Sequence, residues 1–346
     1  MINVLHQSDR RHRKLTGVCR PGFWRLSWLA LALIGGMGSI ASAAAEPVRV
    51  IFDTDMSSDV DDVGAVAVLH ALADAGEAEI LGMGICVNDA ASAPCLNALN
   101  TFYGRPDIPI GVLPGTGKDS PSKYTRGVAD AFPHRLASAA DAPQAVALYR
   151  RLLAGQPDRS VVFVSVGPLT NMAALLDSKP DEFSDLAGRA LVEKKVRIWV
   201  SMGGTFVSGR EFNFFVDTPA TIHAIEAWPT PIVFSGFEIG GSIGTGAGLR
   251  DLPATNPVRR AYELFNGLTD RQSWDQTAVL YAVRGLAGKL DAMWDLSPAG
   301  SVTIAADGSN RWQAAPDRGH RYLIAKMPPA EVARAIEALM AQPPRR

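Results

Sequence analysis

Short apolar runs alternate with segments of helical periodicity over most of the chain after residue 46. Apolar runs of a few residues, bounded by polar or glycine-containing stretches, are typical of buried strands. The expected strands are 48–52, 80–87, 108–113, 161–166, 196–202 and 232–237. The expected helices between or after them are 61–73, 93–103, 144–153, 169–176 and 219–228.

This alternation of strands and helices predicts an α/β fold. We expect an open, mostly parallel, twisted sheet with helices on both faces, of the Rossmann-like kind. In such sheets, ligands bind just outside the carboxyl ends of the strands. The residues that directly follow each expected strand are therefore the first places to search for chemistry.

The C-terminal part of the sequence is less regular. Residues 278–286 and 328–340 have helical periodicity, and the second segment is expected to be the closing helix. The apolar runs 302–305 and 322–324 are expected to pair as strands, with a polar turn at 307–310 between them. Residues 115–134 form a polar segment with glycine and proline and no clear periodicity, which makes it a candidate lid or substrate loop.

The first 45 residues have a pattern of their own. Basic residues at 10, 11, 13 and 14 precede an uncharged stretch, 26–45, which is most apolar at its start and rich in small residues at its end. This three-part pattern predicts a secretory signal peptide over residues 1–45 and one domain over 46–346. The mature protein is then expected in the periplasm or outside the cell. The alternative is an uncleaved membrane anchor, for which the apolar run is short, since a span needs ~20 residues.

Composition and charge narrow the range of partners. Apolar residues make up 47% of the chain, which suits one large globular domain. Removing residues 1–45 takes away six of the 34 basic residues and one of the 35 acidic ones, so the mature chain has a net charge of −6. Without a basic excess, no nucleic-acid partner is expected. Cys86 and Cys95 remain, either as a disulfide, which an oxidising compartment permits, or as two buried thiols.

The strongest chemical signal directly follows the first expected strand. Five carboxylates occur within the ten residues 53–62: Asp53, Asp55, Asp59, Asp61 and Asp62. Crowded carboxylates repel one another, and a folded site tolerates them only when a cation or a proton compensates their charge. A hard cation that prefers oxygen ligands, such as calcium, is the natural candidate. Capping of the following helix is the structural alternative, but it accounts for only one or two of the acids.

At this loop the chain resembles the inosine–uridine nucleoside hydrolase family. That family opens with a strand and an aspartate-rich loop of the form DxDPGxDD. This chain has the aspartates 53 and 55 and then the pair 61 and 62, with two extra residues between. The resemblance continues over about residues 48–290, with matching motifs at 84–88, 97–98, 164–171, 202–204, 211–213, 217–219 and 274–275.

The resemblance implies the nucleoside hydrolase fold and hydrolysis of the N-glycosidic bond of ribonucleosides, which releases ribose and the free base. It implies calcium as the cofactor, held by Asp55, Asp62, the backbone carbonyl of Val166 and Asp275. Asp55 would also be the general base for the attacking water. The implied ribose contacts are Asp61, Asn88, Met202, Glu211 and Asn213. The two-residue insertion leaves Asp59 as an alternative to Asp61 in the ribose role.

One departure from the family pattern concerns the base. Many members have a histidine before the late metal-binding aspartate, as the acid that protonates the leaving base, and this chain has Trp274 there. The purine-preferring branch of the family also has a tryptophan at this place, where it stacks on the base. Asp89, which directly follows Asn88, resembles the same branch. The resemblance therefore implies a base site of Trp274 and Asp89 with purine nucleosides favoured; packing of a helix start is the structural alternative for Trp274.

Two other functions stay open from the sequence. A calcium-dependent nucleoside-binding protein without turnover would also lack the histidine acid. A haloacid-dehalogenase-type phosphatase would use Asp53 as its nucleophile and needs a later lysine, for which Lys194 and Lys195 precede a strand. In each case the expected partner is a small molecule, with no membrane partner after signal cleavage. A homo-oligomer is compatible with the sequence.

Overall fold

The strands of the central sheet are buried on both faces. The computed structural model describes residues 46–115 and 121–345, and the predicted signal peptide lies outside them. On strand β1 (Val48–Thr54), the side chains of Val50 and Phe52 belong to one hydrophobic cluster, and that of Ile51 belongs to another. Successive side chains of a strand point to opposite faces. The apolar runs are therefore continuous because each face of the sheet has its own core.

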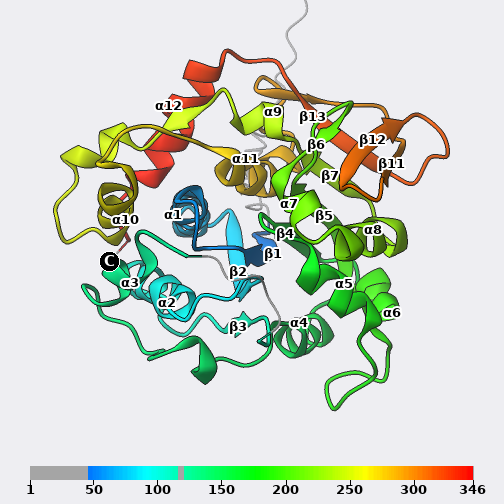
Figure 1. The fold of residues 1–346 in the computed structure, drawn as a ribbon, viewed down its shortest axis with the longest axis horizontal. Helices are drawn as coiled ribbons and strands as arrows, with labels where there is room; N and C mark the ends of the chain where they lie inside the picture. The colour runs from blue at the N-terminus through cyan, green and yellow to red at the C-terminus, as the bar shows by residue number, and fades with distance from the viewer. Residues whose placement is uncertain (1–45, 116–120, 346) are drawn as a thin grey trace, which may run out of the picture. The chain divides into compact units, whose positions relative to one another are not determined.

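The main sheet has eight strands in the described part of the chain, in the order β10-β13-β7-β5-β4-β1-β2-β3 (Figure 1). All neighbouring strands pair in parallel except β10, which runs antiparallel to β13 at one edge. The expectation of an open, mostly parallel sheet is thus confirmed. The strands after β1 are β2 (Ala78–Ile85), β3 (Ile110–Val112), β4 (Val161–Ser165), β5 (Val196–Met202), β7 (Ile232–Ser235), β10 (Trp294–Leu296) and β13 (His320–Ala325).

Helices cover both faces of this sheet. One hydrophobic cluster contains the buried residues of α1 (Asp61–Asp74), α2 (Ser92–Phe102), α10 (Pro257–Asn266), α11 (Trp274–Leu280) and α12 (Pro329–Met340). The other cluster contains those of α4 (Ala145–Ala154), α5 (Thr170–Asp177), α6 (Gly188–Lys195) and α8 (Thr218–Ala227). Figure 1 shows α5, α6 and α8 together at the right of the sheet. The fold therefore has three layers, helix, sheet and helix, as predicted.

The order of the strands places a ligand site beside β1. From β1 the chain first adds β2 and β3 on one side, and then adds β4, β5 and β7 on the other. Connections that leave in opposite directions open a crevice at the carboxyl ends of the two strands where they part. Those strands are β1 and β4, so the aspartate-rich loop and the residues after β4 face the same crevice.

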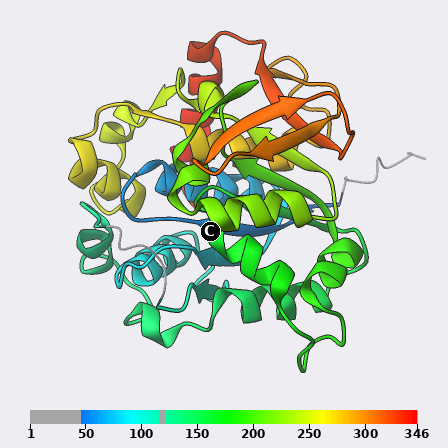
Figure 2. The same cartoon turned by 45° about the vertical axis from the view of Figure 1, so that its right-hand side comes forward.

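The expected strand pairing near the C-terminus is wrong. β11 (Ser301–Ile304) pairs with β12 (Ser309–Gln313), and β12 pairs with β6 (Ser208–Arg210) in a separate small sheet. β11 and β12 are orange at the upper right of Figure 2. Residues 322–324 belong to β13, which joins the main sheet beside β7. The error has a physical reason: β12 has the polar sequence SNRWQ, half exposed, and so lacks the apolar run of a buried strand.

Several other elements differ from the sequence expectations. The candidate lid contains the short helix α3 (Thr125–Ala129), and its residues 116–120 lie outside the described part of the chain. The helix expected at 278–286 begins earlier, at Trp274, and ends in a wider π-helical turn, η3 (Tyr281–Gly285). α6 and α10 were not expected. The remaining short elements are β8 (Gly244–Thr245), β9 (Arg271–Gln272), α7 (Phe212–Val216), α9 (Phe237–Gly240), η1 (Ala139–Asp141) and η2 (Ala247–Asp251).

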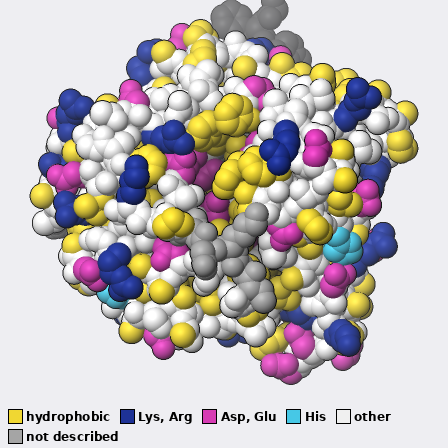
Figure 3. All heavy atoms as spheres, viewed as in Figure 1, with side chains coloured by type: hydrophobic (Ala, Val, Ile, Leu, Met, Phe, Trp, Pro, Cys, Tyr) yellow, Lys and Arg dark blue, Asp and Glu magenta, His cyan; other side chains and the backbone are white. Residues whose placement is uncertain are grey.

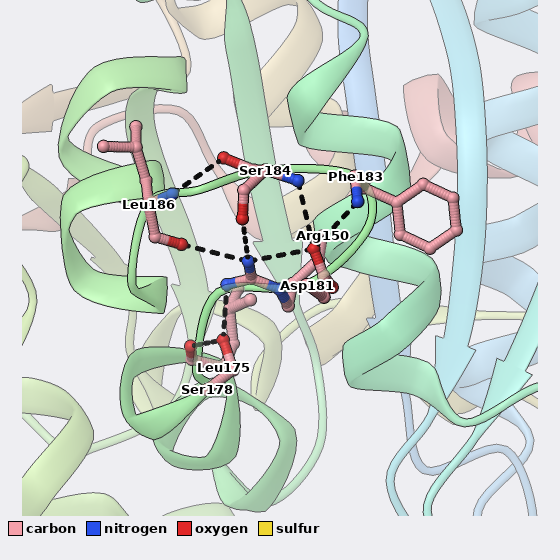
Figure 4. A network of polar contacts seen from close by, with 7 residues as sticks. All are labelled: Arg150, Leu175, Ser178, Asp181, Phe183, Ser184 and Leu186. Carbon is pink, nitrogen blue, oxygen red and sulfur yellow. Dashed lines mark hydrogen bonds and ion pairs between the residues drawn. The ribbon is translucent and has the colours of Figure 1, made fainter.

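A buried arginine fixes the helices behind the sheet. Arg150 of α4 is 2% exposed, and its Nε donates a hydrogen bond of 2.6 Å to Asp181 (Figure 4). Its terminal nitrogens donate to Ser178 Oγ and to the carbonyls of Ser184 and Leu186, each at 3.0 Å. A buried guanidinium is tolerated only when its donors are satisfied in this way. The network ties α4 to the segment between α5 and α6.

Two further observations concern the described residues. Cys86 and Cys95 are both buried free thiols, so the disulfide that the sequence left open is absent from this part of the chain.

Within residues 46–115 and 121–345, each helix is too short or too polar to cross a membrane.

Candidate active site

A cavity of about 310 Å³ opens at the carboxyl ends of the central strands. Figure 3 shows it as a hollow with acidic side chains at its centre and apolar side chains beside them. Its described lining residues are Asp55, Ser58, Asp59, Asp61, Asp62, Val166, Met202, Glu211, Phe212, Asn213, Phe237, Arg271, Trp274 and Asp275. Nine of the eleven site residues predicted from the sequence therefore share one cavity.

Three carboxylates form a tight cluster at the acidic end of the cavity. Asp61 and Asp62 occupy the first turn of α1, and Asp275 occupies the first turn of α11. An oxygen of each lies within 4.8 Å of the others, and all three side chains are at most 4% exposed. Negative charge is favoured in the first turn of a helix, which explains why these acids can be held there. Since α1 packs against α11, two segments more than 200 residues apart meet at one point.

The cluster is positioned by hydrogen bonds from the surrounding backbone and side chains. Thr54 Oγ1 donates to Asp62 Oδ1, and the backbone N–H of Asp275 donates to Asp61 Oδ2 at 3.3 Å. Burial, and then the charge of neighbouring carboxylates, raises the pKa of all three aspartates well above its usual range. The negative form of this cluster is therefore unfavourable in the protein alone, and a bound cation would compensate it. The donor set, all oxygen, fits a hard cation such as calcium.

The membership of this cluster differs from the ligand set implied by the resemblance. Asp61 stands in it, although the resemblance placed Asp61 on the ribose, and Asp55 lies outside the 4.8 Å group but in the same cavity. The Val166 carbonyl accepts a 2.9 Å hydrogen bond from Asn213 Nδ2. A carbonyl oxygen has two lone pairs, so Val166 keeps one for a further partner.

The surroundings of Asp55 raise its pKa to near neutral pH. Burial, followed by the negative charges of Asp59 and Glu211, raises the pKa of Asp55 to about 7. Gly167, which follows β4, lies so close that a Cβ there would be 2.7 Å from the Asp55 Cβ. A glycine is required at this position because any side chain would displace Asp55. A carboxylate with a pKa near neutrality is suited to general-base work.

Glu211 and Asn213 also line the cavity. The Glu211 carboxylate accepts hydrogen bonds from the backbone N–H groups of Gly204 at 3.0 Å and Asn213 at 2.8 Å, which also caps α7. Burial raises the pKa of Glu211 to about 7. Asn213 Nδ2 also donates to the Met202 carbonyl at 3.3 Å. These contacts fix both polar side chains in the cavity wall, where they can meet hydroxyl groups.

Aromatic side chains form the outer end of the cavity. Phe212 is 53% exposed and Phe237 is 47% exposed. The Phe237 ring stacks on Trp274 at 5.1 Å, and Trp274 Nε1 donates a 2.8 Å hydrogen bond to the Phe237 carbonyl. Exposed aromatic rings at a cavity mouth favour a planar, apolar ligand group. The sequence predicted Trp274 here but missed both phenylalanines.

Asn88 and Asp89 are not among the described residues that line the cavity. The Asp89 carboxylate instead accepts hydrogen bonds from Ala91 N at 3.0 Å, from Ser92 Oγ at 3.1 Å and from Thr125 Oγ1 at 2.7 Å. In this structure Asp89 joins the start of α2 to α3. Its proposed contact with a base thus has no support from the geometry.

The structure also brings in an ion pair that the sequence analysis missed. The Asp59 carboxylate accepts hydrogen bonds from Arg271 Nε at 2.9 and 3.1 Å, and both residues line the cavity. Asp59 lies in the insertion relative to the family motif, and Arg271 lies 212 positions later, on β9. No local pattern could have linked them. The sequence offered one indication: Arg271 stands close to Trp274 and Asp275, which the sequence analysis had already assigned to the site.

Asp53 points away from the cavity. It is completely buried and accepts hydrogen bonds from Tyr149 Oη and from Asn171 Nδ2, the latter at 2.7 Å. Burial raises its pKa to about 7. A nucleophile must reach its substrate, so the phosphatase reading, which needs Asp53 in that role, does not fit this geometry.

Comparison with known proteins agrees with the geometry. The model of the inosine-uridine preferring nucleoside hydrolase family matches residues 50–336. No curated protein matches the chain. An inosine-guanosine nucleoside hydrolase structure is similar with a TM-score of 0.65 and 20% identity, over 84% of this chain and 98% of that one. The structure of an inosine-uridine preferring nucleoside hydrolase from Bacillus anthracis is similar with a TM-score of 0.62 and 17% identity, over 84% of this chain and 98% of that one.

A third solved structure, a purine-preferring ribonucleoside hydrolase from Gardnerella vaginalis, has a TM-score of 0.60 and 16% identity, over 84% of this chain and 96% of that one. At such identities the likeness shows a shared fold. The match to the family model covers most of the chain, so it also shows the family. Both the expected fold and the expected family are confirmed: the chain belongs to the inosine-uridine preferring nucleoside hydrolase family, whose members are hydrolases acting on N-glycosyl bonds.

Proposed function

We propose that this nucleoside hydrolase depends on calcium and favours purine ribonucleosides. The observation that carries the calcium proposal is the buried cluster of Asp61, Asp62 and Asp275, whose oxygens lie within 4.8 Å of one another. The cation would be held there, with Asp55 and the Val166 carbonyl from the same cavity as further ligands. When bound, it would compensate the clustered charge and polarise the oxygen atoms near it.

In the proposed reaction Asp55 is the general base. Water forms a bond to C1′ of the ribose, the bond from C1′ to the base nitrogen breaks, and Asp55 takes a proton from the water. A carboxylate works best in this role when its pKa lies near the working pH. Burial and the nearby charges of Asp59 and Glu211 raise the pKa of Asp55 to about 7 in the protein alone. A bound cation would favour the charged form of Asp55, which is the form that accepts a proton.

Glu211 and Asn213 would hold the hydroxyl groups of the ribose, with Met202 packed near the sugar. Their side chains are 4% and 5% exposed and fixed by backbone hydrogen bonds, so they lose little freedom when the sugar binds. Hydrogen bonds to the sugar that strengthen as positive charge develops at C1′ lower the barrier.

The purine preference rests on the aromatic end of the cavity. Trp274 stacks on the exposed Phe237, and the exposed Phe212 lines the same cavity. A two-ring base has more area to place against such side chains than a one-ring base. Ring stacking with a base is worth ~1–3 kcal/mol. We therefore expect kcat/KM to be higher for inosine and guanosine than for uridine and cytidine.

One substrate panel tests both proposals. Ribose release is measured for four ribonucleosides, two purine and two pyrimidine, before and after exhaustive chelation and after calcium is restored. We expect loss of activity on chelation, recovery with calcium and faster purine hydrolysis. Full activity after chelation would contradict the calcium proposal, and equal rates for all four substrates would contradict the purine preference. Tight binding of nucleosides without ribose release would favour the binding protein that the sequence left open.

We further propose that the protein is exported, on the three-part pattern of residues 1–45. The experiment is N-terminal sequencing of the protein from separated cell fractions of a bacterial host. We expect a mature chain that begins near residue 44 or 46, outside the cytoplasm. Recovery of the intact N-terminus from the soluble cytoplasm would contradict this proposal.

A further inference from the structure

The charge distribution of the cavity is uneven. Six of its described lining residues are carboxylic acids: Asp55, Asp59, Asp61, Asp62, Glu211 and Asp275. Arg271 is the one lysine, arginine or histidine among the described lining residues. No histidine acid stands before Asp275, so the chemistry of the leaving base needs another polar group. Arg271 is the basic side chain within reach of that position.

Arg271 lies at the aromatic end of the cavity. Its guanidinium carbon is 5.0 Å from the centre of the Trp274 ring and 5.8 Å from that of Phe265 on α10. These contacts place the cation beside the ring against which the base is proposed to pack. Guanidinium groups are planar and weakly hydrated, so they can lie against aromatic rings and still donate hydrogen bonds in their plane.

Asp59 orients this guanidinium. The Asp59 carboxylate accepts hydrogen bonds from Arg271 Nε and Nη2. The backbone carbonyl of Asp59 accepts a hydrogen bond of 2.6 Å from Tyr124 Oη. The third contact of Arg271 is from Nη1 to Gln272 Oε1 at 3.0 Å. A guanidinium has five N–H groups. Among the hydrogen bonds of the described residues, one N–H on each terminal nitrogen of Arg271 is therefore left for a ligand.

We propose that Arg271, oriented by Asp59, is the residue that binds the acceptor edge of the departing purine and stabilises the charge that develops there. This inference rests on the proposed purine hydrolysis. When the bond to C1′ breaks, its electron pair stays on the base, which leaves as an anion and takes its proton from water. A fixed cation with two free donors is matched to this species.

The same geometry gives Arg271 a role in specificity. The outer edge of hypoxanthine or guanine presents two acceptors, N7 and O6, whereas adenine presents the acceptor N7 and an amino donor. A guanidinium can only donate. Arg271 therefore selects 6-oxopurines, and Asp59, which does not need to touch the substrate, is its positioning residue.

The test compares substrates that differ in how much help the leaving group needs. Inosine and adenosine have poor leaving groups, while 4-nitrophenyl β-D-riboside releases a stable phenolate. The variants are Arg271→Gln, Arg271→Lys and Asp59→Asn, assayed with calcium present. Arg260→Gln is the matched control, because Arg260 forms an exposed ion pair with Glu263 and does not line the cavity.

For Arg271→Gln we expect kcat/KM on inosine to fall by ~10–100-fold, because charged hydrogen bonds are the strong ones, while hydrolysis of the nitrophenyl riboside changes less than about threefold. The inosine-to-adenosine ratio should fall at the same time. Arg271→Lys keeps the ion pair with Asp59 and should lose part of the inosine activity. Asp59→Asn should lose less than Arg271→Gln, again on inosine more than on the riboside. The control should match the wild type on all three substrates.

An equal fall on inosine and on the nitrophenyl riboside would overturn the proposal, because it would mean that Arg271 only holds the fold together. Unchanged inosine hydrolysis in Arg271→Gln would overturn it as well. If the wild type hydrolyses uridine and not inosine, the proposed purine preference fails first and takes this inference with it. If Arg271→Gln does not fold, the same substrate comparison is made with Arg271→Lys, and an unchanged ratio there overturns the proposal.

Discussion

The two ends of the cavity are built in different ways. At the acidic end, Asp61, Asp62 and Asp275 are at most 4% exposed and stand in the first turns of two packed helices. At the aromatic end, Phe212 and Phe237 are about half exposed and belong to short elements at the rim. Buried charges need all of their partners, whereas an exposed ring can be replaced at a modest cost.

This difference separates the reaction from the choice of substrate. In the proposed function, every ribonucleoside offers the same ribose and the same glycosidic bond to the acidic end. Only the base would meet the aromatic end. Changes at the acidic end should therefore lower the rate for all nucleosides alike, and changes at the aromatic end should alter the ratios between nucleosides.

The largest effect is expected at the buried cluster. Asp275→Ala should reduce activity on every nucleoside to the detection limit and remove the rise in melting temperature that calcium causes, because the ligand set becomes incomplete. Asp295→Asn is the matched control, since Asp295 is an exposed acid paired with Lys326. Activity of Asp275→Ala close to wild type in a ribose-release assay would contradict the metal site.

The next effect concerns the general base. Asp55→Asn should lower kcat by ~10²–10⁴-fold on purine and pyrimidine nucleosides alike, because an amide cannot accept the proton of the attacking water. KM should change little. Steady-state kinetics on inosine and uridine measure both quantities. A kcat near that of the wild type would remove Asp55 from this role, and a loss confined to inosine would contradict the division between the two ends.

A smaller and selective effect is expected at the aromatic end. Trp274→Ala should lower kcat/KM on inosine roughly tenfold or more, since stacking is worth ~1–3 kcal/mol, and should lower it less on uridine. Trp274→Phe should keep part of the activity. The melting temperature is measured on the same variants, because Trp274 also packs on Phe237. Equal losses on inosine and uridine together with earlier melting would show that Trp274 is a packing residue.

The smallest effect is on stability and depends on pH. Burial raises the pKa of Asp55 and Glu211 to about 7 in the protein alone, from ordinary values of 3.8 and 4.5. Their folded pKa values exceed the unfolded ones, so their contribution to stability is present below about pH 4 and is lost as pH rises toward about 7. Chelated protein should therefore melt several degrees lower at pH 8 than at pH 5, since ~1 kcal/mol changes the melting temperature of a large domain by about 2–4 °C.

Calcium provides the control for this last prediction. Because the cation favours the charged carboxylates, it should raise the melting temperature more at pH 8 than at pH 5. Differential scanning calorimetry at the two pH values, with chelator and with calcium, gives the four melting temperatures. An equal calcium effect at both values would contradict the titration of carboxylates at the acidic end.

The sequence was most informative where one local pattern carries both structure and chemistry. The apolar runs predicted the parallel strands because each strand is buried on both faces, as Val50 and Ile51 of β1 show. The aspartate-rich loop predicted an acidic site because so many carboxylates cannot be buried together unless a cation or a proton compensates their charge. Family motifs then identified distant cavity residues such as Glu211 and Asp275.

Tertiary structure alone decided the features that join segments far apart in the chain. The Asp59–Arg271 pair bridges 212 positions, and Phe237 becomes a cavity residue only because α9 packs on α11. Asp89 lies away from the cavity for the same kind of reason: Thr125 Oγ1, on the helix α3, which the sequence analysis expected to be a loop, donates a hydrogen bond of 2.7 Å to the Asp89 carboxylate. Periodicity reports which face of an element is buried, whereas these contacts depend on which elements pack together, and that choice is made by the whole core at once.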